Sequence, residues 1–311
     1  MKTFELNTTI SNLQTLRESD LSAYDAVYLG NIYCRSFQEN FLERLSDLKD
    51  GIAFVKDHGV RAYVTSYGAP RNDALRKVQE GLKTAVEAGA DAIEVHNLGV
   101  LRLLHEQFTG TPAHVGGFAN VYTDAGASVL KDYGAVRFTP NYEISLEEIS
   151  AIADAASLPA EILVHGKMPL GISDYCFLLE YEQKWEEKCP TLCQKCLFLK
   201  QGDWAMRSVG KGVLSGKDVC MLEHLPALVN ARHSVFRIES AYESAAYRRD
   251  IGRIYRSALE RAFAGDGGVD EANWDSIGRH TEIGLCNGFY FGRTGGEYIG
   301  SLREPAAACR A

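Results

Sequence analysis

The residues of this sequence whose type and spacing best suit chemistry are its eight cysteines. Four of them, Cys176, Cys189, Cys193 and Cys196, fall within 21 residues, and Cys34 lies far upstream. Thiolates bind zinc, iron–sulfur clusters and copper(I). Because cytosolic thiols stay reduced, such a group in a cytosolic chain indicates metal or redox chemistry rather than disulfides.

The spacing leaves several centres open. A structural zinc site usually shows two paired knuckles, and only Cys193 and Cys196 form a C-x2-C pair. An iron–sulfur cluster can take ligands from scattered loops, which suits this uneven set better. Together with Cys189 the pair also reads C-x3-C-x2-C, the motif of radical SAM enzymes, but no glycine-rich SAM-binding stretch follows it. Thiols without metal are the remaining alternative. Three cysteines are not expected to be ligands: Cys220, Cys286 and Cys309.

The cysteines lie in a chain of alternating strand and helix patterns. Runs of β-branched and aromatic residues predict strands over 23–30, 60–67, 91–97, 112–118, 135–140, 161–166, 216–222 and 235–240. Apolar periodicity predicts helices over 41–59, 72–89, 100–108, 123–133, 145–156 and 241–263. Ser145 and Glu148 form a capping box at the start of one of them. Eight strand–helix units favour the α/β class and a TIM-barrel-like, distorted core.

Two parts are expected along the chain. Residues 1–263 form the barrel-like domain. Residues 264–311 form an irregular C-terminal extension of loops and short strands, packed on or trailing from the barrel, with a disordered end. An insertion over 167–215 follows the sixth predicted strand and carries the cysteine group. In a barrel such an insertion leaves the carboxyl end of the strands, where active sites are built.

Composition excludes several classes of protein. The chain has 311 residues, of which 46% are hydrophobic and 24% charged, as in ordinary globular proteins. A net charge of −8 without a basic patch argues against a nucleic-acid partner. The N-terminal segment lacks the apolar stretch of a secretory signal, and no apolar run approaches the roughly 18 residues of a membrane helix. We therefore expect a cytoplasmic protein without a membrane span.

The segment HGKMPLGISDYCFL (165–178) resembles the signature of the collagenase-like peptidase family, family U32. Pro169 stands where most members have the first of two cysteines, as in the UbiV-like subgroup of oxygen-independent hydroxylation proteins, which serves ubiquinone biosynthesis. Further stretches that resemble the family are 89–104, 215–228, 235–259 and 288–296.

This resemblance implies a [4Fe-4S] cluster on Cys34, Cys176, Cys189 and Cys193, with Cys196 as the alternative to Cys193. It also implies oxygen-independent hydroxylation of an aromatic or quinone-precursor substrate, prephenate as the oxygen donor, and a heterodimer with a paralogue of the same family. A non-catalytic accessory or electron-relay subunit is the alternative. A peptidase is a further one, although the sequence offers no activated Ser or Cys triad for it.

Three histidines lie at or near the ends of predicted strands, where barrel enzymes place catalytic groups: His96, His114 and His165. Each is a candidate catalytic residue, with a hydrogen-bonded core histidine as the plainer interpretation.

Three cations are candidates for binding an anionic substrate: Arg137, Lys167 and Arg237. A buried arginine needs a carboxylate partner, and prephenate carries two carboxylates. An internal ion pair with Glu94 or Glu239 is the alternative for the two arginines.

Overall fold

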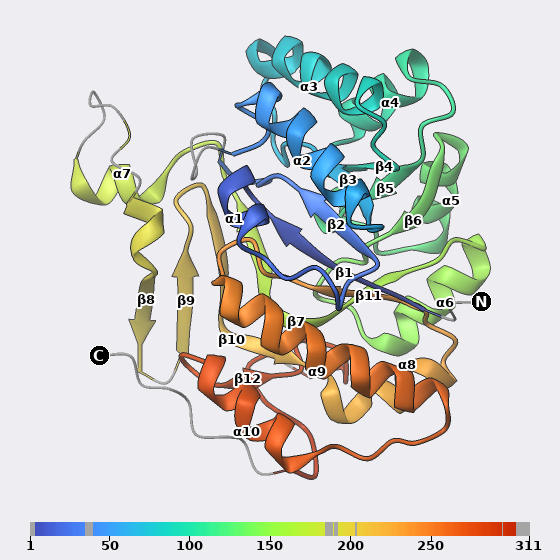
Figure 1. Cartoon of the computed structure of the whole chain (residues 1–311), viewed down its shortest axis with the longest axis vertical. Coiled ribbons are helices and arrows are strands. Elements are labelled where there is room, and N and C mark those ends of the chain that lie inside the picture. Colours follow the sequence, from blue (N-terminus) through green and yellow to red (C-terminus); the bar gives the residue numbers. More distant parts are fainter. Residues whose placement is uncertain are drawn as a thin grey trace.

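The computed structural model describes residues 4–34, 40–183, 189, 192–202, 204–293 and 295–302. Its strands form one large sheet (Figure 1). The strands are β1 (Glu5–Ile10), β2 (Ala26–Leu29), β3 (Arg61–Thr65), β4 (Ala92–Val95), β5 (Ala113–Val115), β6 (Ala135–Phe138), β7 (Glu161–Ile172), β8 (Leu197–Gln201), β9 (Trp204–Ser208), β10 (Gly212–Cys220), β11 (Val235–Ile238) and β12 (Leu285–Cys286).

Eight parallel strands of this sheet close into a barrel-like ring. Strands β1 to β6 pair in chain order, β1 also pairs with β11, and β11 pairs with β7. A single parallel bridge between Phe138 and Ala160 joins the ends of this path. The α/β class with a parallel-strand core is therefore confirmed, and the closure between β6 and β7 is its weakest seam.

Helices and single turns connect the strands and cover the outside of the ring (Figure 1). The α-helices are α1 (Leu13–Arg17), α2 (Leu45–Asp57), α3 (Leu75–Glu87), α4 (Leu98–Gln107), α5 (Asp124–Asp132), α6 (Leu146–Ala156), α7 (Phe177–Glu182), α8 (Leu225–Asn230), α9 (Ala245–Phe263) and α10 (Glu271–His280). The predicted capping box is present, since the Ser145 hydroxyl accepts from the Glu148 amide while the Glu148 carboxylate accepts from Ser145.

Two strand predictions need correction. The run predicted over 216–222 belongs to β10, which pairs antiparallel with β7 and lies outside the ring. Its place is taken by β1, which the strand patterns did not include. The segment ELNTTI is buried throughout although four of its six residues are polar, so no apolar run reveals the strand.

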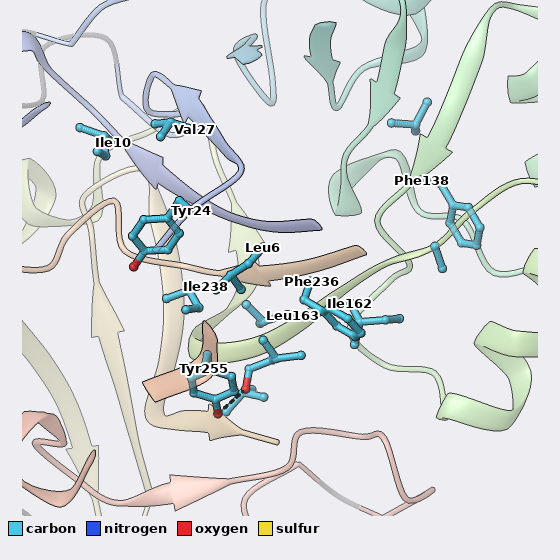
Figure 2. Close-up of a cluster of buried hydrophobic side chains, with 14 of the residues drawn as sticks. Leu6, Ile10, Tyr24, Val27, Phe138, Ile162, Leu163, Phe236, Ile238 and Tyr255 are labelled. Atoms are coloured by element: carbon cyan, nitrogen blue, oxygen red, sulfur yellow. Dashed lines mark hydrogen bonds between the residues drawn. The ribbon is translucent and has the colours of Figure 1, made fainter. Parts of the chain in front are cut away.

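The core lies between the ring and its helices. Apolar residues such as Leu6, Val27 and Phe236 are fully buried there (Figure 2). From α9, the Tyr255 hydroxyl donates a hydrogen bond of 2.9 Å to the Val164 carbonyl of β7. This contact joins the longest helix to the strand that continues into the cysteine insertion.

The insertion forms a unit beside the ring. After β7 the chain passes through α7, the 3₁₀ turn Leu192–Lys195 and the hairpin of β8 and β9, and it returns along β10 (Figure 1). β8 pairs only with β9, so the hairpin forms one end of the sheet.

The segment after α9 packs on the ring as far as the structure describes it. It contains α10, which the sequence pattern did not predict, and β12, which pairs with β10. Trp274, Ile277 and Tyr290 are buried in the main core. The predicted disorder of the last residues falls on 303–311, outside the described residues. Within the described part of the chain, no helix has the length and apolar character needed to cross a membrane.

Candidate functional site

Cys34 sits in a loop after β2 that two asparagines hold in place. The Asn31 side-chain oxygen accepts hydrogen bonds from the backbone amides of Tyr33 and Cys34, at 3.0 and 3.2 Å, and from the Tyr242 hydroxyl at 3.2 Å. The Asn40 side-chain amide donates to the Cys34 carbonyl at 3.1 Å. The loop is thereby anchored at both sides of its undescribed part.

Cys176 precedes the first residue of α7 and lies against the turn between β9 and β10. The Phe177 amide donates to the Gly210 carbonyl at 2.9 Å. Gly210 has φ +82°, and a Cβ built there would stand 3.2 Å from Cys176 Sγ and 3.8 Å from Cys193 Cβ. A glycine at this position therefore suits both the left-handed backbone and the space beside two cysteines.

Cys193 is only 7% exposed and packs with Leu178 and Leu192. Burial, and after it the neighbouring thiols of Cys34, Cys189 and Cys176 in that order, raise the pKa of its thiol to about 12. The structure thus brings together the four cysteines that the family resemblance groups as ligands. They arrive from the end of β2, from α7 and from the loop before β8.

Cys196 points elsewhere. Its backbone is left-handed, with φ +54°, and its thiol donates to the Glu282 carboxylate, with Sγ 3.3 Å from Oε1. Burial raises its pKa to about 11, and Arg207 lowers it. Two further cysteines, Cys220 and Cys286, are buried in the main core, as expected, and Cys309 lies outside the described residues.

The four grouped cysteines form a soft donor set, and within the described residues no disulfide joins them. No three Cys, His, Asp or Glu side chains of the described ranges surround one point as the ligands of a single metal ion do. A [4Fe-4S] cluster makes a different demand, because each thiolate binds its own iron and the sulfurs stand farther apart than around one zinc. The donor chemistry therefore fits a cluster better than a mononuclear site.

The interior of the ring holds a network of buried charges instead of a purely apolar filling. Arg237 donates to Glu94 at 2.5 Å and to Glu161 at 3.2 Å, and its Nε lies 3.6 Å from Glu239. Burial alone would raise the pKa of Glu94, but the Arg237 guanidinium holds it well below its ordinary value. Arg237 therefore has the internal partners that the sequence left as its alternative.

Arg137 is likewise satisfied by the chain itself. It donates to both carboxylate oxygens of Glu5, at 2.6 and 3.0 Å, and to Glu161 at 3.2 Å. Glu5 also pairs with Arg61 at 2.7 Å. Because these residues lie at the amino ends of β1, β3 and β7, they close the end of the ring opposite to the cysteines. Neither Glu5 nor Glu161 was singled out from the sequence.

The three candidate histidines occupy different places. His96 faces a small cavity at the carboxyl end of the ring, lined also by Tyr33, Tyr142 and Arg237, and its Nε2 is 3.3 Å from Glu94. His114 lies inside the ring with Nδ1 2.9 Å from the Tyr28 hydroxyl.

His165 lies apart from this cavity, between β7 and α9. Its Nδ1 is 3.1 Å from the Tyr255 hydroxyl. Burial lowers the pKa of the His165 imidazole to about 3, so this side chain is neutral at physiological pH. Burial also holds the pKa of His114 well below its ordinary value.

Lys167, like His165, lies away from the cavity at the carboxyl end of the ring. It is buried beside β10, with Nζ 3.2 Å from Asp218 and 3.8 Å from Glu282. Burial raises the pKa of Asp218 to about 6. This group of charges lies on the side of Cys196.

A cleft of about 500 Å³ opens beside Cys34. Its walls come from the loops that follow β2, β3 and β7, which is the carboxyl end of the ring, where barrel enzymes bind substrates. Arg71, Lys77 and Lys211 line it together with the aromatic rings of Tyr33 and Tyr67. The sequence-based candidates missed these cations. The available signal was that Arg71 lies four residues after the end of the strand predicted over 60–67.

Known proteins resemble this chain over most of its length. A family model described as peptidase family U32 matches residues 11–300. An uncharacterized protease of Methanocaldococcus jannaschii is 30% identical, a match that covers 84% of this chain and 66% of that protein. A 23S rRNA 5-hydroxycytidine synthase of Escherichia coli is 26% identical, in a match that covers 78% of this chain and 37% of that protein. The tRNA hydroxylation protein P of Helicobacter pylori strain J99 is 27% identical, in a match that covers 84% of this chain and 65% of that protein. The chain thus spans between 37% and 66% of the length of these relatives.

Proposed function

The chain belongs to peptidase family U32, as its signature segment predicts, and from that premise we propose that it is an iron–sulfur protein of oxygen-independent hydroxylation. The observation that carries the proposal is the convergence of four thiols at the rim of a cleft. Cys193 lies among Cys34, Cys176 and Cys189, and Cys34 lines the cleft itself.

In this proposal the four thiolates hold a [4Fe-4S] cluster, which supplies one-electron transfer when bound. The protein's part is to bury and orient the sulfurs. Leu178 and Leu192 cover Cys193, and Asn31 fixes the backbone of Cys34. Because ligands must be deprotonated, loading the site releases the proton that the raised pKa keeps on Cys193 in the metal-free protein.

The substrate we propose is an aromatic or quinone-precursor ring bound in the cleft, with an anionic oxygen donor such as prephenate. The interior arginines are poor candidates for the donor, because Arg137 and Arg237 already bind three carboxylates of the chain. The cations of the cleft are more accessible. A paralogue of the same family is the proposed partner, and a non-catalytic accessory or electron-relay role is the alternative within the same scheme.

An RNA base is the second candidate substrate, since two of the reported relatives are named for rRNA and tRNA hydroxylation. A base is also an aromatic ring. Against this candidate stands the net charge of −8, because RNA affinity comes largely from cations on phosphates.

Proteolysis is less well supported. A hydrolytic nucleophile needs a hydrogen-bonded base, and His96 Nε2 instead lies 3.3 Å from the Glu94 carboxylate. The other two candidate histidines bind tyrosine hydroxyls.

The first test is anaerobic purification followed by iron and sulfide counts and a visible spectrum. We expect about four irons per chain, the content of one [4Fe-4S] cluster. Zinc, or reduced thiols without metal, would overturn the proposal. The second test compares quinone precursors and RNA nucleosides, by mass spectrometry, from cells that lack and cells that express the protein under anaerobic conditions. The class that gains an oxygen atom only in the expressing cells identifies the substrate, and no change in either class favours the accessory role.

A further inference from the structure

The cleft beside Cys34 has one charged wall and one apolar wall. Ile32, Tyr33, Tyr67 and Ile172 supply the apolar surface. Tyr33 and Tyr67 are buried, so their rings are fixed rather than free in solvent. Tyr33 packs edge-on against Phe118 at 5.8 Å between ring centroids. This wall suits a flat ring.

The charged wall is centred on Asp174, which follows β7. Its carboxylate accepts from Arg71 Nη1 at 3.0 Å and from Lys211 Nζ at 3.3 Å. The two cations thus converge on one carboxylate group inside the cleft. Arg71 comes from the loop after β3 and Lys211 from the turn next to Gly210, so loops far apart in sequence build this arrangement.

Asp174 is a weak internal partner for these cations. The three side chains are between 32% and 66% exposed. Ion pairs of such exposure contribute little to stability, because water competes for both charges. The carboxylate of a ligand can therefore replace that of Asp174 at low cost, in the same place and with the same geometry.

We propose that this cleft binds a small ring compound carrying a carboxylate. Arg71 and Lys211 take its carboxylate in place of Asp174, and the ring lies against Tyr33 and Tyr67, next to Cys34. The role of this binding rests on the proposed function: it would bring the anionic oxygen donor beside the cysteine group. The binding itself does not depend on that function.

The contrast with the ring interior supports this choice. Inside the ring, Arg237 faces Glu94, Glu161 and Glu239, so carboxylates outnumber the guanidinium that meets them. In the cleft, Arg71, Lys77 and Lys211 face Asp73 and Asp174, so the cations of the lining outnumber its acids. An added anion is attracted to the cleft and repelled from the interior.

Isothermal titration of the full-length protein with prephenate tests the proposal. Arg71→Ala and Lys211→Ala should each weaken binding about tenfold, the effect of losing one charge-assisted hydrogen bond. Asp174→Asn should tighten binding several-fold, because it removes the competing carboxylate. Arg76→Ala is the matched control, since Arg76 lies five residues away, is 89% exposed, pairs with Glu80 and does not line the cleft.

Equal weakening by Arg71→Ala and Arg76→Ala, or weaker binding by Asp174→Asn, overturns the proposal. So does displacement of prephenate by equimolar inorganic phosphate or tRNA, which would make the cleft a phosphate site. Iron content is measured on every sample. A wild-type protein that carries its cluster but does not bind prephenate refutes this inference alone, whereas a protein that binds prephenate but never acquires iron refutes the proposed function alone.

Discussion

At the scale of single residues, the proposed cluster depends on which thiols lie beside one another. Cys193 and Cys196 are three residues apart, yet one is buried beside Cys34 and Cys176 while the other is bonded to Glu282. We predict that Cys193→Ser loses the iron of anaerobically purified protein and that Cys196→Ser retains it. Removing the hydrogen bond of Cys196 should cost only about 1 kcal/mol of stability.

Cys34→Ser is the second arm of this iron measurement. It should lose iron as Cys193→Ser does, although no cysteine motif surrounds it. If Cys34→Ser keeps its iron while Cys196→Ser loses it, the ligand set is instead the local one within 176–196, and the subgroup assignment fails.

His165 gives a prediction about pH. Burial lowers its pKa from 6.5 to about 3, so between these values the unfolded chain binds more protons than the folded one. The free energy of unfolding therefore rises with pH across this window and is lost as the pH falls below 6.5. His165→Gln should flatten this dependence in urea titrations between pH 4 and 7, while His105→Gln, at an exposed position, should leave it unchanged.

Asp218 acts in the opposite sense, because its pKa is raised to about 6 and the folded state holds the extra proton below that value. Asp218 therefore reduces the contribution of His165 to the slope of the wild type. An unchanged slope in His165→Gln would show that the imidazole is not neutral when folded.

The sequence reached part of this residue-scale picture. The family resemblance grouped the thiols that the structure brings together, because the family pattern encodes a three-dimensional arrangement. The sequence could not decide whether Arg137 and Arg237 bind a substrate or a carboxylate of the chain itself. For Arg237 the sequence named Glu94 and Glu239 as alternative partners, and both lie against it. The carboxylates that bind Arg137, Glu5 and Glu161, are distant in sequence and stand at strand starts, where nothing marks them as inward-facing.

At the scale of elements, the turn between β9 and β10 couples the insertion to the thiols. We predict that Gly210→Ala lowers iron content sharply, because a methyl group there stands 3.2 Å from Cys176 Sγ. Gly202→Ala is its control: it has a comparable left-handed backbone, at φ +59°, but nothing within 4 Å of the added carbon.

Both glycine variants should lose about 1 kcal/mol of stability, the cost of placing alanine in a left-handed backbone. Iron content separates them. Equal iron content in the two variants would mean that the turn at Gly210 shifts to accommodate the methyl group without displacing Cys176.

Helices of the ring followed the sequence closely, because each shows an apolar stripe facing the strands. Among the strands that did not follow it are β1 and β10. In β1, polar side chains such as Asn7 face a charged interior, so the usual apolar signal is missing. In β10, the apolar run is real, but composition cannot tell an antiparallel neighbour of β7 from a member of the parallel ring.

At the scale of the whole molecule, the segment after α9 is part of the barrel's core. Tyr290 is buried and its hydroxyl donates to the Leu163 carbonyl at 2.9 Å. We predict that Tyr290→Ala lowers the free energy of unfolding by about 3–5 kcal/mol, the usual cost of deleting a buried aromatic ring. Phe291→Ala should cost much less, since Phe291 is 38% exposed.

Urea unfolding of the two variants measures the difference. Similar losses in both would mean that the segment folds apart from the ring. Packing on the barrel was one of two alternatives expected for this segment. Its helix α10 was not predicted, because the segment is rich in glycine and its buried residues Trp274 and Ile277 are too few for a periodic pattern.

The wide sequence separation of the four thiols has a consequence for biosynthesis. Cys34 and Cys176 are 142 residues apart (176 minus 34), and the ring that brings them together also needs β11, which ends at Ile238. During translation Cys34 therefore leaves the ribosome long before the ring that brings the four cysteines together can form. Insertion of the proposed cluster must therefore wait until β11 has been made, so the proposal requires a folded, metal-free form with reduced thiols that receives iron afterwards.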